Sequence, residues 1–145
     1  VVQEHFISNL IRRKISVAID NVYPETKSES KKFVLFLPEG ETHELLLLFT
    51  EYILRKRHHQ VAYIGSSLPF NELDFIAKSF KPNYLVTFFT IPIEKETVQH
   101  YLKNLSNSFP KTGIITGGTQ LATEKVKLPS NCVLVNSLTD LVNAI

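Results

Sequence analysis

Residues 33–57, FVLFLPEGETHELLLLFTEYILRKR, contain the local pattern that decides the fold. The run Phe33–Leu37 is apolar without polar alternation, which is typical of a strand buried on both faces. A polar loop follows, and the stretch Glu44–Arg57 then repeats its apolar residues with a helical period. A buried strand, a loop and a helix in this order predict the first part of a βαβ unit.

The same alternation continues to the end of the chain. Further strands are predicted at Val61–Gly65, Tyr84–Phe89, Gly113–Thr116 and Cys132–Val135. Further helices are predicted at Phe70–Phe80, Ile93–Asn107, Thr119–Glu124 and Leu138–Ala144, with Pro69 and Pro92 in first turns. Five such units predict a doubly wound α/β domain over residues 33–145, with a five-stranded parallel sheet in the flavodoxin-like order 2-1-3-4-5.

A different pattern precedes this domain. Residues Val2–Val22 are predicted to form one helix, because apolar side chains recur at helical spacing with basic residues between them. The segment Glu25–Lys32 has no apolar residue, and we interpret residues 24–32 as a linker. A lone amphipathic helix cannot bury its apolar stripe, so its partners lie either upstream or on the following domain. We expect residues 1–23 to be the C-terminal helix of a truncated helical bundle.

Composition limits what the chain can do. Its 145 residues are the size of one domain, and a hydrophobic fraction of 43% excludes a disordered chain. The single cysteine, Cys132, excludes an internal disulfide and a thiolate metal cage. The longest apolar run, Leu45–Phe49, is too short to span a membrane, and no secretory signal is present, so we expect a cytoplasmic protein. The net charge of +2 does not indicate nucleic-acid binding by this segment.

Sheets of this kind bind ligands at the carboxyl ends of their strands, so the loops there are the first candidates for a site. The first of these loops contains Glu41 and His43, just before a predicted helix. A neutral imidazole can ligate a transition metal through one ring nitrogen, and a carboxylate bonded to the other nitrogen would fix its tautomer. The alternative is that Glu41 and Glu44 complement the helix N-terminus and that His43 is a solvated first-turn residue.

The fourth loop contains adjacent glycines, Gly117 and Gly118, before a predicted helix. Adjacent glycines let a ligand approach the backbone closely, although a tight turn is the alternative. Dinucleotide and phosphate-loop motifs are absent. No Asp ends the third strand, so a phospho-acceptor receiver domain is not expected. No nucleophile–base pair and no pair of acid and base carboxylates is evident, so we do not expect an enzyme.

Together, these residues resemble the cobalamin-binding domain shared by methionine synthase, cobalamin mutases and MerR-type regulators. The motif of that domain is Asp/Glu-x-His-x-x-Gly, then Ser-x-Leu/Val/Thr on the third strand, then Gly-Gly. Glu41-Thr42-His43 matches its first part and Gly117-Gly118 its last. The stretch from residue 39 to 82 is most similar to the light- and cobalamin-responsive MerR-family repressors.

The resemblance implies a role for each matching residue of the α/β domain. His43 would be the lower axial cobalt ligand and would displace the cofactor's own benzimidazole base. Glu41 would orient His43 through a hydrogen bond. Gly117 and Gly118 would flank the nucleotide tail of the cofactor, and Thr87 would stand for the Ser of the motif.

The leading helix also fits the resemblance, because Glu4-His5 is similar to the Glu-His of the bundle motif in these repressors. Glu4 and His5 would then lie over the upper face of the corrin. The resemblance implies that the chain is the cobalamin-sensing effector domain of a MerR-type transcriptional regulator. Such a regulator would self-associate, and it would contact DNA only through an upstream domain.

Two residues depart from the motif. Leu46 holds its Gly position, and Phe89 lies on the same strand face as Thr87, where a smaller residue is usual. The alternative function is therefore a degenerate domain, in which Leu46 and Phe89 close the tail slot. The fold would then serve as an oligomerisation or protein-interaction module without a cofactor.

Overall fold

The structure is a computed structural model that describes residues 2–23, 25, 27–93 and 96–145. At its centre lies an all-parallel sheet of five strands: β1 (Lys32–Pro38), β2 (Gln60–Leu68), β3 (Tyr84–Phe88), β4 (Gly113–Gly117) and β5 (Cys132–Val135). The strand order is β2-β1-β3-β4-β5, which confirms the predicted flavodoxin-like order.

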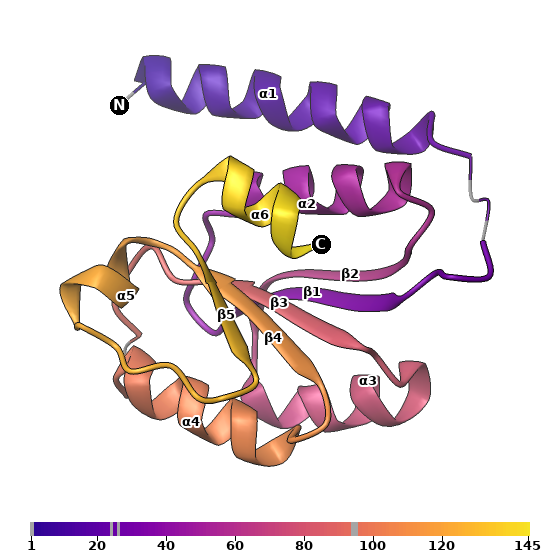
Figure 1. Ribbon diagram of the computed structural model, residues 1–145. Helices are drawn as coiled ribbons and strands as arrows, with labels where there is room; N and C mark the ends of the chain where they lie inside the picture. The colour runs from indigo at the N-terminus through magenta and orange to yellow at the C-terminus, as the bar shows by residue number, and fades with distance from the viewer. Residues whose placement is uncertain (1, 24, 26, 94–95) are drawn as a thin grey trace.

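Helices cover both faces of the sheet, as a doubly wound fold requires (Figure 1). On one face lie α2 (Leu45–Lys56) and α6 (Leu138–Ala144), and on the other lie α3 (Leu73–Phe80) and α4 (Val98–Ser108). A 3-10 turn, Phe70–Glu72, precedes α3, and the short helix α5 (Thr119–Thr123) follows β4. The leading helix α1 (Val2–Asp20) forms a further layer outside α2.

Two apolar cores, one on each face of the sheet, hold these layers together. The core beneath α2 and α6 contains Phe33, Leu35, Leu37, Leu47, Leu54, Val86, Phe88, Ile115, Val135 and Leu141. The core beneath α3 and α4 contains Val34, Phe36, Leu73, Leu85, Phe89, Val98, Tyr101, Leu102, Leu105, Phe109, Ile114 and Leu121. Successive strand residues point to opposite faces, so β1 supplies both cores. The prediction that this strand is buried on both faces is confirmed.

Truncation of Leu35 should destabilise the whole domain, because this side chain is fully buried at the centre of β1. We expect Leu35→Ala to lower the free energy of unfolding by about 2–5 kcal/mol, the usual loss for a leucine in a packed core. Urea unfolding followed by circular dichroism measures this loss. Val133→Ala is the matched control, because Val133 lies on β5 and is 49% exposed. An equal loss in the two variants would contradict the assignment of β1 to the core.

The leading helix α1 is attached only loosely to the α/β domain. None of its 19 residues is buried, and Phe6, Ile7, Leu10 and Val17 are exposed apolar side chains. Its half-buried residues, such as Ile15 and Ile19, lie on the side toward α2. The following domain therefore covers only part of the apolar surface of α1. No helix among the described residues, α1 included, is long and apolar enough to cross a membrane.

The start of α4 and the end of β2 differ from their predicted positions. The helix predicted from Ile93 begins at Val98, because the Thr97 side chain caps it by accepting a hydrogen bond from the His100 amide. Pro92 consequently lies in a loop and not in a first turn, while residues 94 and 95 lie outside the described part. Strand β2 extends to Leu68, beyond the predicted end at residue 65, through register shifts against β1.

Candidate functional site

The loop between β1 and α2 turns the Glu41 side chain inward at the carboxyl edge of the sheet. Gly40 adopts a φ of +88°, a left-handed conformation that favours glycine, and its amide donates to the Ser67 hydroxyl. The Glu41 amide donates to the Pro38 carbonyl and closes the turn. Only 3% of Glu41 is exposed, so this carboxylate is a buried charged group that needs hydrogen-bond donors.

Five donors surround the Glu41 carboxylate. Its Oε1 atom accepts from the His43 amide at 2.9 Å and lies 2.7 Å from His43 Nδ1. Its Oε2 atom accepts from the Thr90 amide at 2.7 Å, from the Thr90 hydroxyl at 2.6 Å and from the Ile91 amide at 3.1 Å. Thr90 Oγ1 also lies 3.0 Å from His43 Nδ1. The carboxylate thereby ties the first carboxyl-edge loop to the third.

These contacts determine the charge of Glu41 and the tautomer of His43. Burial alone would raise the pKa of Glu41, but the hydrogen bonds from Thr90 and His43 outweigh it and lower this pKa to about 2. The carboxylate is therefore ionised at neutral pH and can only accept hydrogen bonds. His43 Nδ1 must supply the proton in the bond to Glu41, which leaves the lone pair of the neutral imidazole on Nε2.

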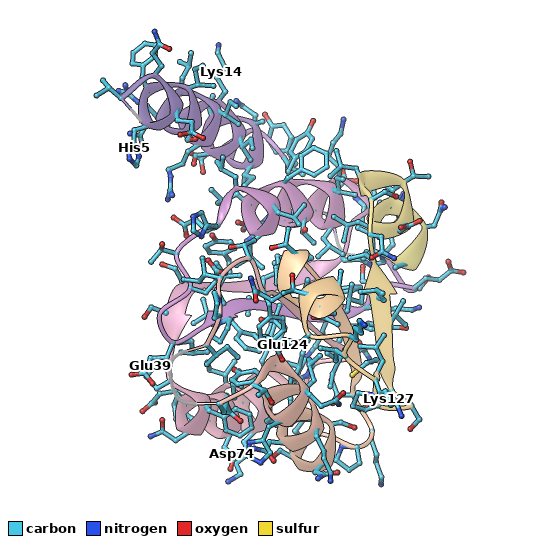
Figure 2. All side chains as sticks on the ribbon, turned by 90° about the vertical axis from the view of Figure 1, so that its left-hand side faces the viewer. His5, Lys14, Glu39, Asp74, Glu124 and Lys127 are labelled. Carbon is cyan, nitrogen blue, oxygen red and sulfur yellow. The ribbon has the colours of Figure 1, made fainter. Side chains whose placement is uncertain are left out.

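The oriented imidazole of His43 opens into a cleft between the α/β domain and α1. The His43 side chain is 61% exposed although its Nδ1 atom is held in place. The cleft has a volume of about 410 Å³ and is lined from α1 by Glu4, His5, Ser8, Asn9 and Arg12. Figure 2 shows His5 on the side of α1 that faces the rest of the molecule. Glu4 and His5 of α1 therefore line the same cleft as His43.

Thr90 is a member of the site that the sequence analysis missed. The resemblance assigned the hydroxyl position to Thr87, three residues earlier, yet it is Thr90 that contacts both Glu41 and His43. Thr87 is fully buried within β3, and its Oγ1 atom has no partner among the described residues. Its neighbours Val86 and Phe88 face α2 and α6, so Thr87 faces α3 and α4. The position of Thr90, directly after the third strand, was the signal that could have identified it.

Gly117 and Gly118 are both needed for the packing of the sheet and its loops, because neither position has room for a side chain. A Cβ atom on Gly117 would collide with the Val135 carbonyl of the neighbouring strand. Gly118 has a φ of +110°, and a Cβ atom there would collide with the Phe89 backbone. Packing of the loop against its neighbours therefore explains both glycines without a ligand.

A second cavity, of about 480 Å³, opens beside Gly118 at the carboxyl ends of β4 and β5. Leu46 lines this cavity together with Leu141 and does not fill it. Phe89 faces the opposite side of the sheet, where its ring contacts that of Tyr101, so it cannot occlude the cavity. The expectation that Leu46 and Phe89 fill one channel together is therefore wrong, because the two side chains belong to opposite faces.

Comparison with known proteins identifies the fold of the chain but does not assign it to a family. No family model and no curated protein matches the chain. A cobalamin-binding protein from Desulfitobacterium hafniense is 14% identical, with a TM-score of 0.60 over 80% of this chain and 58% of that one. The methanol:cobalamin methyltransferase complex MtaBC from Methanosarcina barkeri is 18% identical, with a TM-score of 0.62 over 85% of this chain and 46% of that one.

A response regulator is also similar in fold. The isolated receiver domain of RcsB from Salmonella enterica serovar Typhimurium is 17% identical, with a TM-score of 0.52 over 80% of this chain and 86% of that one. At these identities the likeness shows the fold alone, a flavodoxin-like α/β domain of the kind found in cobalamin-binding proteins. The chain spans about half the length of the two cobalamin-related structures.

Proposed function

We propose that this chain is a cobalamin-binding domain in which His43 Nε2 is the lower cobalt ligand. The observation that carries the proposal is the contact of the buried Glu41 carboxylate with His43 Nδ1, because it fixes the tautomer in which the lone pair of a neutral imidazole is on Nε2. A histidine held in this way by a carboxylate is a typical transition-metal ligand. Thr90 supports the arrangement by donating to the other carboxylate oxygen.

Two cavities open at the carboxyl edge of the sheet. Both the cleft next to His43 and the cavity beside Gly118 fall within the range of about 300–1,000 Å³ that small-molecule sites occupy. A corrin macrocycle is larger than the cleft alone, so its binding requires α1 to move outward. This movement breaks the ion pair between Arg12 and Glu44 and the contacts of half-buried α1 residues with α2, but it exposes no fully buried residue of α1. Bound cobalamin would supply a cobalt ion that His43 could ligate.

The further role that we propose is sensing, in a regulator of the MerR type. Cobalamin between α1 and the α/β domain would favour one assembly state of the protein, because a ligand shifts an equilibrium only through different affinities for its two states. Self-association would respond to the ligand, and sequence-specific recognition of DNA would come from a domain outside these residues. The location of Glu4 and His5 in the His43 cleft supports this role. We propose no enzymatic activity for the chain itself.

Two other functions have less support. A phosphoryl-accepting receiver shares the topology, but Thr87-Phe88-Phe89-Thr90 ends β3 without an Asp. Nor do the described residues contain a group of three or more His, Cys, Asp or Glu side chains that could hold a metal ion. A degenerate domain without cofactor requires a closed slot, whereas the cavity beside Leu46 is open.

Titration with adenosylcobalamin, followed by visible absorption, tests the proposal. We expect a red species that remains with the protein through gel filtration and has the spectrum of a histidine-ligated cobalamin. A protein that emerges colourless at ligand concentrations well above the micromolar range would reject the proposal. Leu46→Gly then tests the degenerate alternative, because that alternative predicts restored binding when the leucine is removed.

A further inference from the structure

Acidic and basic side chains are separated between the two edges of the sheet. The segments that follow the strands include eight acidic residues, against the cations Lys125 and Lys127 after α5: Glu39, Glu41, Glu44, Glu72, Asp74, Glu96, Glu124 and Asp140. At the opposite edge, the segments around the starts of β1, β2, β3 and β4 contain six cations, which we call the basic edge: Lys31, Lys32, Lys56, Arg57, Lys81 and Lys111. The small net charge of +2 conceals this separation.

Hydrogen bonds between these loops make the basic edge one continuous surface. The Lys31 amide donates to His59 Nδ1, next to the start of β2. The Lys32 amide donates to Asn83 Oδ1, next to the start of β3, at 2.8 Å. The Gly113 amide at the start of β4 donates to the Asn83 carbonyl. Neighbouring strands lie about 5 Å apart, so cations from β1 to β4 follow one another along the edge.

The six cations have no carboxylate partner in the part of the chain that the structure describes. Lys31 and Lys32 instead place their ammonium groups over the rings of Tyr84 and Phe80, at 5.4 Å from each ring centroid. Arg57 donates to the Val142 carbonyl. All but Lys32 are exposed. Their charges therefore face solvent and are not neutralised by ion pairs.

Compensation of helix dipoles explains only part of this charge. The helices α2, α3, α4 and α6 end at this edge, and each helix C-terminus carries roughly half a negative charge. Glu25 and Glu29, in the segment before β1, add two carboxylates. Against six cations, these contributions leave an excess of roughly two positive charges on one edge. The edge is therefore more basic than local compensation requires.

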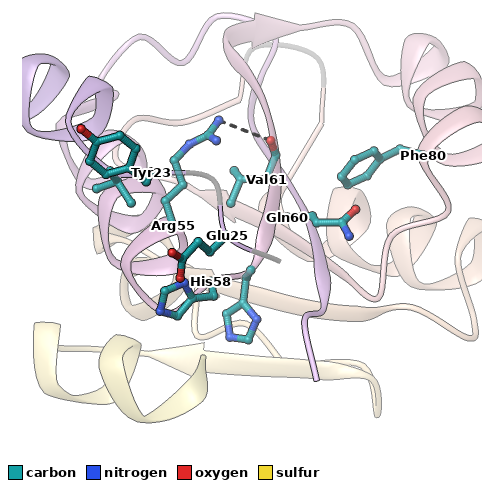
Figure 3. Close-up of a pocket in the computed structure, with 9 residues that line it drawn as sticks. Tyr23, Glu25, Arg55, His58, Gln60, Val61 and Phe80 are labelled. Carbon is teal, nitrogen blue, oxygen red and sulfur yellow. Dashed lines mark hydrogen bonds between the residues drawn. The ribbon is translucent and has the colours of Figure 1, made fainter. Parts of the chain in front are cut away.

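A hollow of about 220 Å³ lies on the same edge. It is not a pocket for a small anion, so it does not explain the excess positive charge. It is lined by Arg55, His58, His59 and Gln60, among others (Figure 3). Arg55 is already paired with Glu51 and contacts the Val61 carbonyl. Glu25 also lines the hollow and would repel an anion. The cations of the basic edge lie along a row and do not converge on this hollow.

We propose that the basic edge docks the phosphodiester backbone of a nucleic acid, without reading its sequence. A row of separate cations matches a ligand with repeated negative charges better than it matches one small anion. This inference goes beyond the proposed function, because the basic edge and the His43 cleft lie at opposite ends of the strands. It is independent of whether cobalamin binds.

Fluorescence anisotropy of a labelled DNA duplex, measured between about 50 mM and about 200 mM salt, tests this proposal. We expect weak, salt-sensitive binding by the chain. The double variant Lys81→Glu, Lys111→Glu should bind at least roughly tenfold more weakly, with a salt slope smaller by about two. Arg13→Glu with Lys14→Glu is the control, because it changes the net charge equally on the exposed side of α1 and should keep most of the binding.

Three outcomes would overturn the proposal. The first is no detectable binding at about 50 mM salt, where electrostatic contacts are strong. The second is an equal loss in the α1 control, which would reflect net charge and not the basic edge. The third is equally tight binding of polyglutamate, which would indicate an acidic protein as the partner. Circular dichroism confirms that the variants fold.

Discussion

Replacement of His43 by alanine is expected to abolish retention of cobalamin, with affinity at least roughly 100-fold lower. Loss of a residue that only orients a metal ligand already costs about 10–100-fold, so loss of the ligand itself costs more. Of the two described histidines that line the cleft, His43 is the one whose Nδ1 atom is held, by Glu41 and Thr90. Visible absorption after gel filtration measures the retained cofactor.

Two further variants serve as controls for this experiment. Thr90→Val removes one donor to Glu41 and should weaken binding by less than His43→Ala does, while the spectrum keeps its histidine-ligated form. His100→Ala removes an exposed histidine on α4, whose Nδ1 contacts Glu96, and should bind like the original chain. If His43→Ala kept both the colour and the spectrum, His43 would not be the ligand.

Glu41 should make folding stability depend on pH between about 4.5 and about 2. Its pKa falls from 4.5 to about 2 on folding, so the folded state favours the ionised carboxylate. The stabilisation is therefore fully present above pH 4.5, decreases as the pH falls, and is lost near pH 2. Two to three pKa units correspond to roughly 3 kcal/mol.

Comparison with Glu41→Gln isolates this contribution. A glutamine side chain has an NH2 group in place of one carboxylate oxygen, and this group cannot accept the hydrogen bonds on its side. We therefore expect this variant to be about 2–3 kcal/mol less stable at pH 7. The difference from the original chain should shrink toward pH 2, because the carboxylate of Glu41 is then protonated. Urea unfolding at a series of pH values measures it. Glu72→Gln, at an exposed position, is the control. A difference that did not change with pH would contradict the lowered pKa of Glu41.

The sheet could be predicted because its strands carry an unambiguous signal. Phe33–Leu37 is apolar throughout and lies between polar segments, and such a run has few alternatives in a chain of this size. The start of α4 was less predictable, since Ile93 continues the helical period although the capping side chain is Thr97. A periodic pattern shows that a helix exists, but the cap determines where it begins.

The site could be predicted only where its residues are close in sequence. Glu41 and His43 are two residues apart, so their contact follows from local geometry. The contact between Glu41 and Thr90 spans 49 positions and depends on how β1 and β3 pair. Phe89 and Leu46 could not be assigned to opposite faces before the location of α2 was known. Long-range contacts of this kind require the assembled sheet.

The collisions that a side chain would cause at Gly117 and Gly118 affect how such sequences should be compared. A chain of this fold that bound no cofactor would still need both glycines, because the backbone around them leaves no room for a methyl group. Selection on the fold alone would also preserve Glu41, whose carboxylate is buried and hydrogen-bonded. Under the proposed function, the largely exposed His43 is therefore the better marker of ligand binding.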